Sequence, residues 1–414
     1  MTDTTDRTKW WRRFRFRLSL RLLMVVVLII GGLLGWVGYR ARVQRQAVAT
    51  LVQAGVKVGY DFQEPGASPA WWQPKWLVDA VGVDYLAHVA RVQVDPMAQR
   101  TDRASGLTDT DLALVGRLAH LETLSLVGSQ AFTDAGLAHL QNLTRLKRLD
   151  IMGQPGISGA SLAHLAGLAR LEQLQFTTPR IDDADLAHLS GLVGLRSLTL
   201  MLDENSGVTD AGLAHLEPLQ ELRSLQLDQA TRITNQGLAH LGKLARLDSL
   251  NLTNARVTDL KGLESLTDLR ILILMGTPIG DAGHASLPRF SKLELLSAGR
   301  ELTDAGLIHL WELPGLISLD LSSTRITDAG LATLGEFPRL ERVDVGFTAV
   351  GDPGIAALDK LPKLNSLNVL LTKVTDEGVK AAKAAHPGLT VIGPQAPQGT
   401  GFFGTSFIAI PNSP

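Results

Sequence analysis

The chain has 414 residues, no cysteine and a formal net charge of −1 at pH 7. This length accommodates a large core or several domains, and the lack of cysteine excludes disulfides, zinc–thiolate sites and cysteine nucleophiles. The charge is distributed unevenly, because residues 1–45 hold ten Lys/Arg against two Asp/Glu and the rest of the chain is net acidic. A basic end of this kind is typical of a nucleic-acid-binding arm or of a segment that flanks a membrane span.

The first predicted element is an uncharged apolar run, LLMVVVLIIGGLLGWVGY, from Leu22 to Tyr39. As a helix its eighteen residues would measure about 27 Å, close to the thickness of a bilayer core. Seven cationic residues precede the run and three follow it. We therefore predict a transmembrane helix at 22–39, a basic cytoplasmic N-terminus at 1–21 and an extracytoplasmic remainder. Aromatic residues flank both ends of the run, as they do at membrane interfaces: Trp10, Trp11, Trp36 and Tyr39.

The alternative interpretation of this run is a cleaved signal peptide. The apolar region is unusually long for one, and Ala47-Val48-Ala49 is the single acceptable cleavage site, so we expect an uncleaved anchor. Gly31 and Gly35 have the GxxxG spacing of paired membrane helices, which leaves a homo-oligomer open.

Residues 40–88 are predicted to form a linker and an N-terminal capping region. QRQAVATLVQAG favours a helix, VKVGYDF (56–62) a strand and WLVDAVG (76–82) a second helix. The intervening PAWWQPKW contains Trp71, Trp72 and Trp76. These indole rings would form either a carbohydrate or ligand platform or part of a cap that shields the open end of a repeat array.

Residues 89–393 repeat a unit of mostly 24 or 25 residues. One half of the unit is LxxLxL, as in LETLSL (121–126) and LRSLTL (195–200), with VARVQV (89–94) as an early degenerate member. Its period of two predicts a short strand with leucines inward. A parallel return after so few residues favours a helix as the crossover.

The other half of the unit is TDAGLAHL, which occurs identically at 133–140 and 209–216. A Thr-Asp pair such as Thr209-Asp210 predicts a helix N-cap. Leu213, Leu216 and Leu219 would then line one helix face. Because no unit buries its apolar face alone, stacked units would share one core.

With these repeats the chain resembles leucine-rich repeat proteins, over about residues 86–393. The unit is most similar to the cysteine-containing subtype of F-box substrate receptors, although the chain has neither cysteine nor F-box. Together with the apolar run, it resembles membrane-anchored repeat proteins encoded by some bacterial genomes. The resemblance implies an α/β solenoid with parallel strands on the concave face and helices on the convex face. Residues 394–414, rich in Pro, Gly and Ser, predict a disordered tail.

Six histidines share one helical phase in the repeats. A metal requires imidazoles that meet within about 2.1 Å of one point, whereas these lie on separate helices whose axes would stand about 8–10 Å apart. No nucleophile recurs with them. We expect half-exposed helix residues, and we predict no metal, cofactor or catalytic residues. The six are His139, His164, His188, His215, His240 and His309.

The outward residues of LxxLxL predict where a partner would bind. In the early units they carry both charges, which does not suit nucleic acid. The stretch RILILM (270–275) is apolar on both faces, so the sequence predicts an exposed apolar patch for a protein or peptide ligand. Its alternative is a local register shift. The predicted patch comprises Ile271, Ile273, Met275, Leu295 and Ile317, ringed by Arg270, Glu294, Asp320 and Arg342.

Taken together, these features predict a non-catalytic scaffold that is anchored in a membrane by residues 22–39 and presents a concave surface for protein–protein interaction. The alternative is a structural, self-associating protein of the cell envelope. An enzyme is disfavoured because no acid, base, nucleophile and metal set converges in the pattern.

Overall fold

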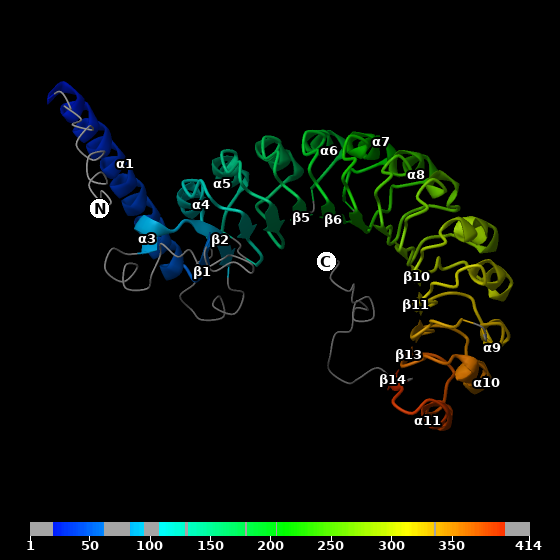
Figure 1. Ribbon diagram of the computed structural model, residues 1–414. Coiled ribbons are helices and arrows are strands. Elements are labelled where there is room, and N and C mark those ends of the chain that lie inside the picture. The colour runs from blue at the N-terminus through cyan, green and yellow to red at the C-terminus, as the bar shows by residue number, and fades with distance from the viewer. Residues whose placement is uncertain are drawn as a thin grey trace, which may run out of the picture.

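The computed structural model describes residues 20–61, 83–94, 107–128, 131–178, 180–203, 205–334 and 337–393. Repeated strand–turn–helix units stack into a curved arc, with strands along its inner side and helical turns along its outer side (Figure 1). One long helix, α1 (Leu20–Gln53), projects from the N-terminal end of the arc. The architecture is an α/β leucine-rich repeat solenoid with a parallel sheet.

The sheet has fourteen strands, ordered β1 to β14 as they occur in the chain. β1 pairs antiparallel with β2, and every later neighbour pairs parallel and in the same repeat register, as in Leu225↔Leu250↔Leu272. The strands are β1 Val56–Tyr60, β2 Val89–Val94, β3 Thr123–Ser125, β4 Arg148–Ile151, β5 Gln173–Thr177, β6 Ser197–Met201, β7 Ser224–Asp228, β8 Ser249–Asn251, β9 Ile271–Ile273, β10 Leu295–Ser297, β11 Ser318–Asp320, β12 Arg342–Asp344, β13 Ser366–Asn368 and β14 Thr390–Ile392.

The convex side is built from short helical turns, many of them 3-10. Leu213 and Leu216 lie in one such pair of turns, but Leu219 lies beyond it, so the predicted continuous helix face is wrong at its end. Pro218 follows the second turn and cannot continue it. The segments are α3 Val83–Leu86, α4 Asp109–Val115, α5 Asp134–Leu137, η4 Ala138–Leu140, η5 Gly159–His164, α6 Asp183–Leu186, η6 Ala187–Leu189, α7 Asp210–Leu213, η7 Ala214–Leu216, α8 Asn235–Leu241, η8 Lys261–Leu263, η9 Asp281–Arg289, η10 Asp304–Leu310, α9 Asp328–Leu331, α10 Asp352–Ala356, η11 Ala357–Lys360 and α11 Asp376–Ala385.

The core is one continuous stack of leucine columns between the sheet and the helical turns. Leu198, Leu225 and Leu250 occupy equivalent positions on neighbouring strands, and each is fully buried. Removing such a side chain typically costs about 2–5 kcal/mol. Each repeat is therefore stabilised mainly by the repeats on either side of it.

Thr-Asp pairs join several of the helical turns to the turn of the next repeat. Thr209 Oγ1 accepts a hydrogen bond from the Ala211 backbone N–H, as the sequence predicts for an N-cap. The carboxylate of Asp210 then accepts bonds from the backbone N–H and hydroxyl of Thr234 in the following repeat, at 2.8 and 2.5 Å. This second role, which the sequence pattern did not reveal, is a capping ladder along the convex side.

The N-terminal end departs from the predicted boundaries. α1 continues without a break through residues 40–45, where a linker was expected, so the apolar run and the first helix of the capping region are one helix. Ala47 and Leu51 of α1 are fully buried in the core cluster. The segment 76–82, the residues Trp71, Trp72 and Trp76, and the tail 394–414 lie outside the described residues.

Candidate interaction surfaces

The concave surface is formed by the second, third and fifth residues of each LxxLxL unit. The third and fifth residues lie in the strands and align from repeat to repeat, as in Ser249↔Ile271↔Leu295 and Asn251↔Ile273↔Ser297. The second residues precede the strands along one side of the sheet. Three parallel columns of side chains thus follow the arc.

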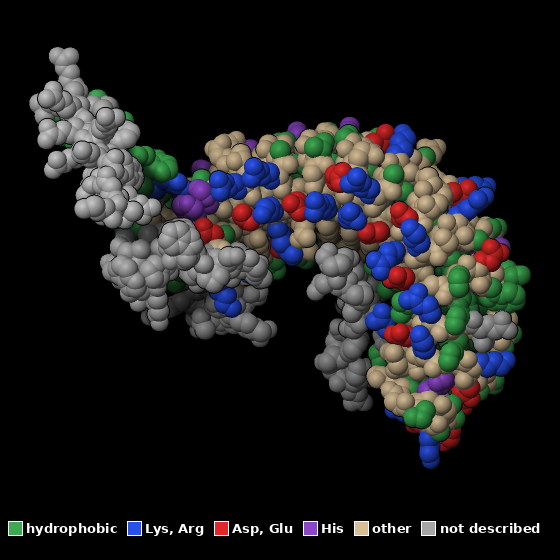
Figure 2. Space-filling view, in the orientation of Figure 1, with side chains coloured by type: hydrophobic (Ala, Val, Ile, Leu, Met, Phe, Trp, Pro, Cys, Tyr) green, Lys and Arg blue, Asp and Glu red, His purple; other side chains and the backbone are tan. Residues whose placement is uncertain are grey.

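The second-position column is a row of charged side chains of both signs from Glu122 to Glu294. Lys147 bonds Glu122 at 2.7 Å, and the same pairing recurs at Arg196–Glu172, Arg223–Asp248 and Arg270–Glu294. In Figure 2, Lys or Arg and Asp or Glu side chains are interspersed along the face of the arc that is in view. Exposed ion pairs of this kind contribute about 0–1 kcal/mol each to the stability of the fold. Their side chains can therefore break these pairs and form new ion pairs with a binding partner. The surface is of mixed sign, as the sequence indicates.

The structure brings the five residues of the predicted apolar patch to one region, but not as five exposed side chains. Ile271, Met275 and Ile317 are half-buried. Ile273 and Leu295 are only 3% and 5% exposed, so the expectation of exposure is wrong for these two. Strands about 4.8 Å apart hold neighbouring side chains in contact, and curvature toward the concave side draws them closer still.

The register in this region is regular. Ile273 aligns with Asn251 on one side and Ser297 on the other, so the alternative of a local register shift is wrong. Ile317 occupies the second position and follows Glu294 in the charge column, whereas Leu295 lies directly beside Ile271. The patch therefore spans all three columns, with Ile317 in the second-position column, Ile271 and Leu295 in the third and Ile273 in the fifth, and Met275 follows its LxxLxL unit.

The polar residues expected to ring the patch behave differently from one another. Arg270 makes a two-point contact with Glu294, at 3.0 and 2.8 Å. Arg342 is half-buried and its Nε lacks a hydrogen-bond partner. Asp320 accepts bonds from the Ser322 N–H and the Ser297 hydroxyl. Among the described residues, Arg342 is thus the ring residue with a buried donor that has no partner.

Asp320 and Asp344 stand side by side in the fifth-position column. Burial raises the pKa of Asp320. Burial, and secondarily the charge of Asp320, raise the pKa of Asp344 to about 6. Asn368 donates to Asp344 at 2.8 Å, which opposes the shift. The concave face therefore holds an acidic pair in which both pKa values are raised, that of Asp344 to about 6.

The six repeat histidines lie on the convex side, each half-buried or exposed. Within the described ranges, no group of three or more His, Asp or Glu residues is placed to hold a metal ion. His240 Nδ1 lies 2.5 Å from Glu217, which also binds Lys243. Buried His284 replaces a leucine of the repeat and bonds the Gly280 carbonyl at 2.8 Å. These contacts give His240 and His284 structural roles.

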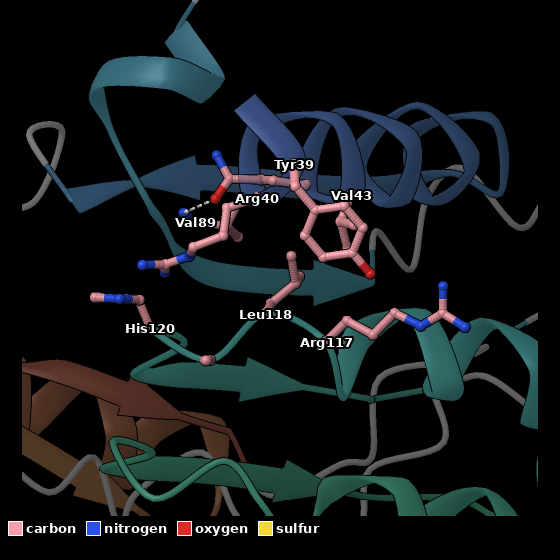
Figure 3. Close-up of a pocket in the computed structure, with 9 residues that line it drawn as sticks. Tyr39, Arg40, Val43, Val89, Arg117, Leu118 and His120 are labelled. Carbon is pink, nitrogen blue, oxygen red and sulfur yellow. Dashed lines mark hydrogen bonds between the residues drawn. The ribbon is translucent and has the colours of Figure 1, made fainter. Parts of the chain in front are cut away.

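A second candidate site was missed by the sequence analysis. A cavity of 520 Å³ lies between α1 and the turn that precedes β3, and Tyr39, Arg40, Arg117 and His120 are among its lining residues (Figure 3). His120 stacks on His88 with ring centroids 3.8 Å apart. Burial, then the neighbouring His88, Arg145 and Arg40, lower the pKa of His120 to about 4. Tyr39-Arg40 at the end of the apolar run was the available signal.

Comparisons with known proteins agree with the repeat architecture. A family model described as Leucine Rich repeat matches residues 316–335. No curated protein matches the chain in sequence. An internalin from Listeria monocytogenes is 21% identical, with a TM-score of 0.41 over 66% of this chain and 92% of that one.

Two further solved structures are similar at the same level. A leucine-rich repeat protein from Leptospira interrogans is 16% identical, with a TM-score of 0.47 over 68% of this chain and 74% of that one. A chain of the yeast Rad7–Elc1 complex is 20% identical, with a TM-score of 0.46 over 91% and 98%. At these identities the comparisons concern the fold alone.

Proposed function

We propose that the protein is a non-catalytic, membrane-anchored scaffold whose concave surface binds another protein or peptide. The observation that carries the proposal is the continuous row of outward strand residues along the concave side of fourteen strands. Solenoids use such extended concave surfaces for binding because neighbouring repeats present equivalent positions at a fixed spacing. The ligand would contact the apolar patch and exchange ion pairs with the charge column.

The anchor is the second part of the proposal. In the described part of the chain, Leu23–Gln53 is the one helix long and apolar enough to cross a bilayer. None of its most apolar window is buried against the rest of the chain that the structure describes, and Leu28 and Leu34 are 72% and 67% exposed. Side chains this apolar are stable when lipid surrounds them. The positive-inside bias places the solenoid outside the cytoplasm.

The test is photo-crosslinking of the full chain in its own membrane. A benzophenone amino acid replaces Ile271 or Ile317 on the concave side, or the exposed His139 or His188 on the convex side. We expect an adduct with a foreign protein from the concave positions alone. Adducts formed equally from both sides would reject the concave surface as the binding site. Adducts only with copies of the same chain would support the structural, self-associating alternative.

A variant then locates the contact. With the crosslinker at Gln226, the double substitution Ile271→Glu and Ile317→Glu should abolish the adduct, because a partner would have to desolvate two new carboxylates. Ile308→Glu, at a side chain that is 54% exposed on the convex side, is the matched control. Ile273 and Leu295 are left unchanged because a charge at these buried positions would destabilise the fold itself.

A further inference from the structure

The cavity beside α1 lies where the apolar run ends. Tyr39 is the last residue of that run and lines the cavity, and Arg40 and Val43 follow it on the same helix. At 1.5 Å per residue, Val43 is about 6 Å beyond Tyr39 along the helix axis. The headgroup layer on each side of a bilayer core is about 5–8 Å thick. With α1 in a membrane, the cavity would lie in the headgroup layer.

The packing of α1 against the solenoid fixes the position of the cavity relative to the end of the apolar run. Gln44 donates to Asp84 and to the Ala87 carbonyl, at 3.1 and 3.0 Å, and so ties α1 to the segment before β2. Arg45 pairs with the same Asp84. These contacts fix the first repeats against the part of the helix that would emerge from the bilayer.

The lining is cationic at its ends and apolar between them. Arg40 and Arg117 form no ion pair within the described part of the chain, and none of the described lining residues is acidic. Val43, Val89 and Leu118 supply the apolar surface. In Figure 3 the two arginine side chains extend away from each other with Leu118 between them.

The Arg40 side chain also faces the membrane side. Its guanidinium carbon lies 4.8 Å from the ring centroid of Trp36, one turn nearer the apolar run. Trp36 is 55% exposed and Tyr39 is 68% exposed, as expected for aromatic residues at a bilayer interface. A guanidinium that packs on the Trp36 ring is placed to contact the phosphate of a neighbouring lipid.

His120 adds a hydrogen-bond donor without a charge. The Arg145 guanidinium only donates, so His120 Nδ1 accepts at 2.9 Å and the neutral ring carries its proton on Nε2. The surrounding positive charge, together with burial, keeps the pKa of His120 low. An anion that enters the cavity would reduce the electrostatic repulsion between these cationic groups.

From this arrangement we infer that the cavity binds the phosphate headgroup of an anionic phospholipid. Arg40 contacts the phosphate, and Arg117 at the other end of the cavity attracts its negative charge over a longer distance. Val43 and Leu118 lie against the glycerol and the first acyl carbons. The inference rests on the membrane anchor of the proposed function. A free phosphate ion shares the charge chemistry but would leave the apolar part of the cavity without a partner.

The test uses the full chain in a neutral detergent, with binding followed by native mass spectrometry. The probes are short-chain phosphatidylglycerol, the matching phosphatidylcholine and inorganic phosphate. We expect phosphatidylglycerol to bind most tightly. Arg40→Gln and Arg117→Gln should each weaken its binding about five-fold, and the double variant about 25-fold. Phosphatidylcholine should lose less affinity, because its choline offsets the charge of the same phosphate.

Two controls keep the result interpretable. Arg256→Gln removes the same charge from an exposed position in the middle of the solenoid and should change nothing. Arg40→Lys and Arg117→Lys keep the charge and should retain most of the affinity, even if the glutamine variants fold poorly. Equal binding of both lipids, or unchanged binding in a folded double variant, would overturn the inference. Binding of inorganic phosphate as tight as that of phosphatidylglycerol would overturn the lipid assignment.

Flotation separates this inference from the anchor itself. Full chain reconstituted with phosphatidylcholine vesicles should float whether or not Arg40 and Arg117 are substituted, because the apolar run alone inserts. A chain that does not float would refute the anchor. A chain that floats but shows no preference for phosphatidylglycerol would refute only the headgroup site.

Discussion

At the scale of single residues, the backbone conformation is most restricted two positions after the last buried residue of each LxxLxL unit. Eight repeats adopt a left-handed backbone there, with Gly128, Gly153 and Gly276 in three of them. Phe347 and Leu371 occupy the same position with φ of 58° and 52°. Their side chains are 54% and 53% exposed, so burial offsets little of the cost of this conformation.

Substituting these two residues should therefore stabilise the fold. A left-handed conformation costs a bulky residue about 1–2 kcal/mol, and asparagine, which stands at Asn254, tolerates it. We expect Phe347→Asn and Leu371→Asn each to raise the free energy of unfolding by about 1 kcal/mol in urea denaturation. Ser323→Phe, at the same repeat position, should lower it. Loss of stability in both asparagine variants would show that the exposed side chains contribute more than the turn costs.

The acidic pair on the concave face makes stability depend on pH. The folded-state pKa of Asp344, about 6, is above that of the unfolded chain. The proton it takes up stabilises the folded state in acid, and this contribution is lost as the pH rises through 6. Asp320→Asn removes the neighbouring charge, and the introduced amide can donate to the Ser297 hydroxyl.

We expect Asp320→Asn to raise the free energy of unfolding at pH 7 by about 1–2 kcal/mol and to reduce the difference between pH 5 and pH 7. The measurement is urea denaturation at the two pH values. Asp359→Asn is the control, because that carboxylate is exposed and away from the pair. A pH difference that is the same in wild type and Asp320→Asn would show that the two carboxylates do not interact.

At the scale of elements, the Thr-Asp-Ala-Gly sequence is explained by contact between consecutive repeats. The aspartate of one repeat binds the cap of the next, and the glycine leaves room for it. A Cβ at Gly237 would come within 2.9 Å of Leu213 Cδ1 and closer still to Asp210 Oδ1. The recurring tetrapeptide is therefore a packing motif, and the histidine that follows it faces outward.

This contact predicts coupling between two substitutions. Gly237→Ala should cost about 1–3 kcal/mol through overpacking, and Asp210→Ala about 1–3 kcal/mol because Thr234 loses its acceptor. The cost of Gly237→Ala should be smaller in the Asp210→Ala background, where one of its two close contacts is absent. Urea denaturation of the four chains measures the difference. Gly191→Ala, where a Cβ would lie 3.5 Å from its nearest neighbour, should be almost neutral. Strictly additive costs would contradict the contact.

The strands could be predicted from the sequence because their signal is local. VARVQV and the later LxxLxL units appear as strands at the expected positions, since a period of two admits one buried face. The helical side was less predictable, because the choice between α and 3-10 turns depends on packing against the neighbouring repeats. The exposure of Ile273 and Leu295 depends on the curvature of the whole sheet, which no single repeat encodes.

At the scale of the whole molecule, α1 combines two predicted parts. The apolar run and the first capping helix were expected as separate segments, but residues 40–45 remain helical and continue into the buried Ala47 and Leu51. A continuous helix fixes the direction of the apolar run relative to the solenoid. The cavity at Tyr39 and Arg40 arises from this junction, which explains why repeat patterns alone did not reveal it.

The orientation of the chain across the membrane is the last prediction, and the absence of cysteine makes it directly measurable. Ala211→Cys places one thiol at an exposed position on the convex side, and Thr8→Cys places one before the apolar run. Because cationic residues are more numerous before the run than after it, a membrane-impermeant maleimide should label Ala211→Cys in intact cells and Thr8→Cys only after permeabilisation. The unsubstituted chain, which has no thiol, is the control. The reverse pattern would place the solenoid in the cytoplasm, and labelling of both positions in intact cells would indicate that the run does not span the membrane.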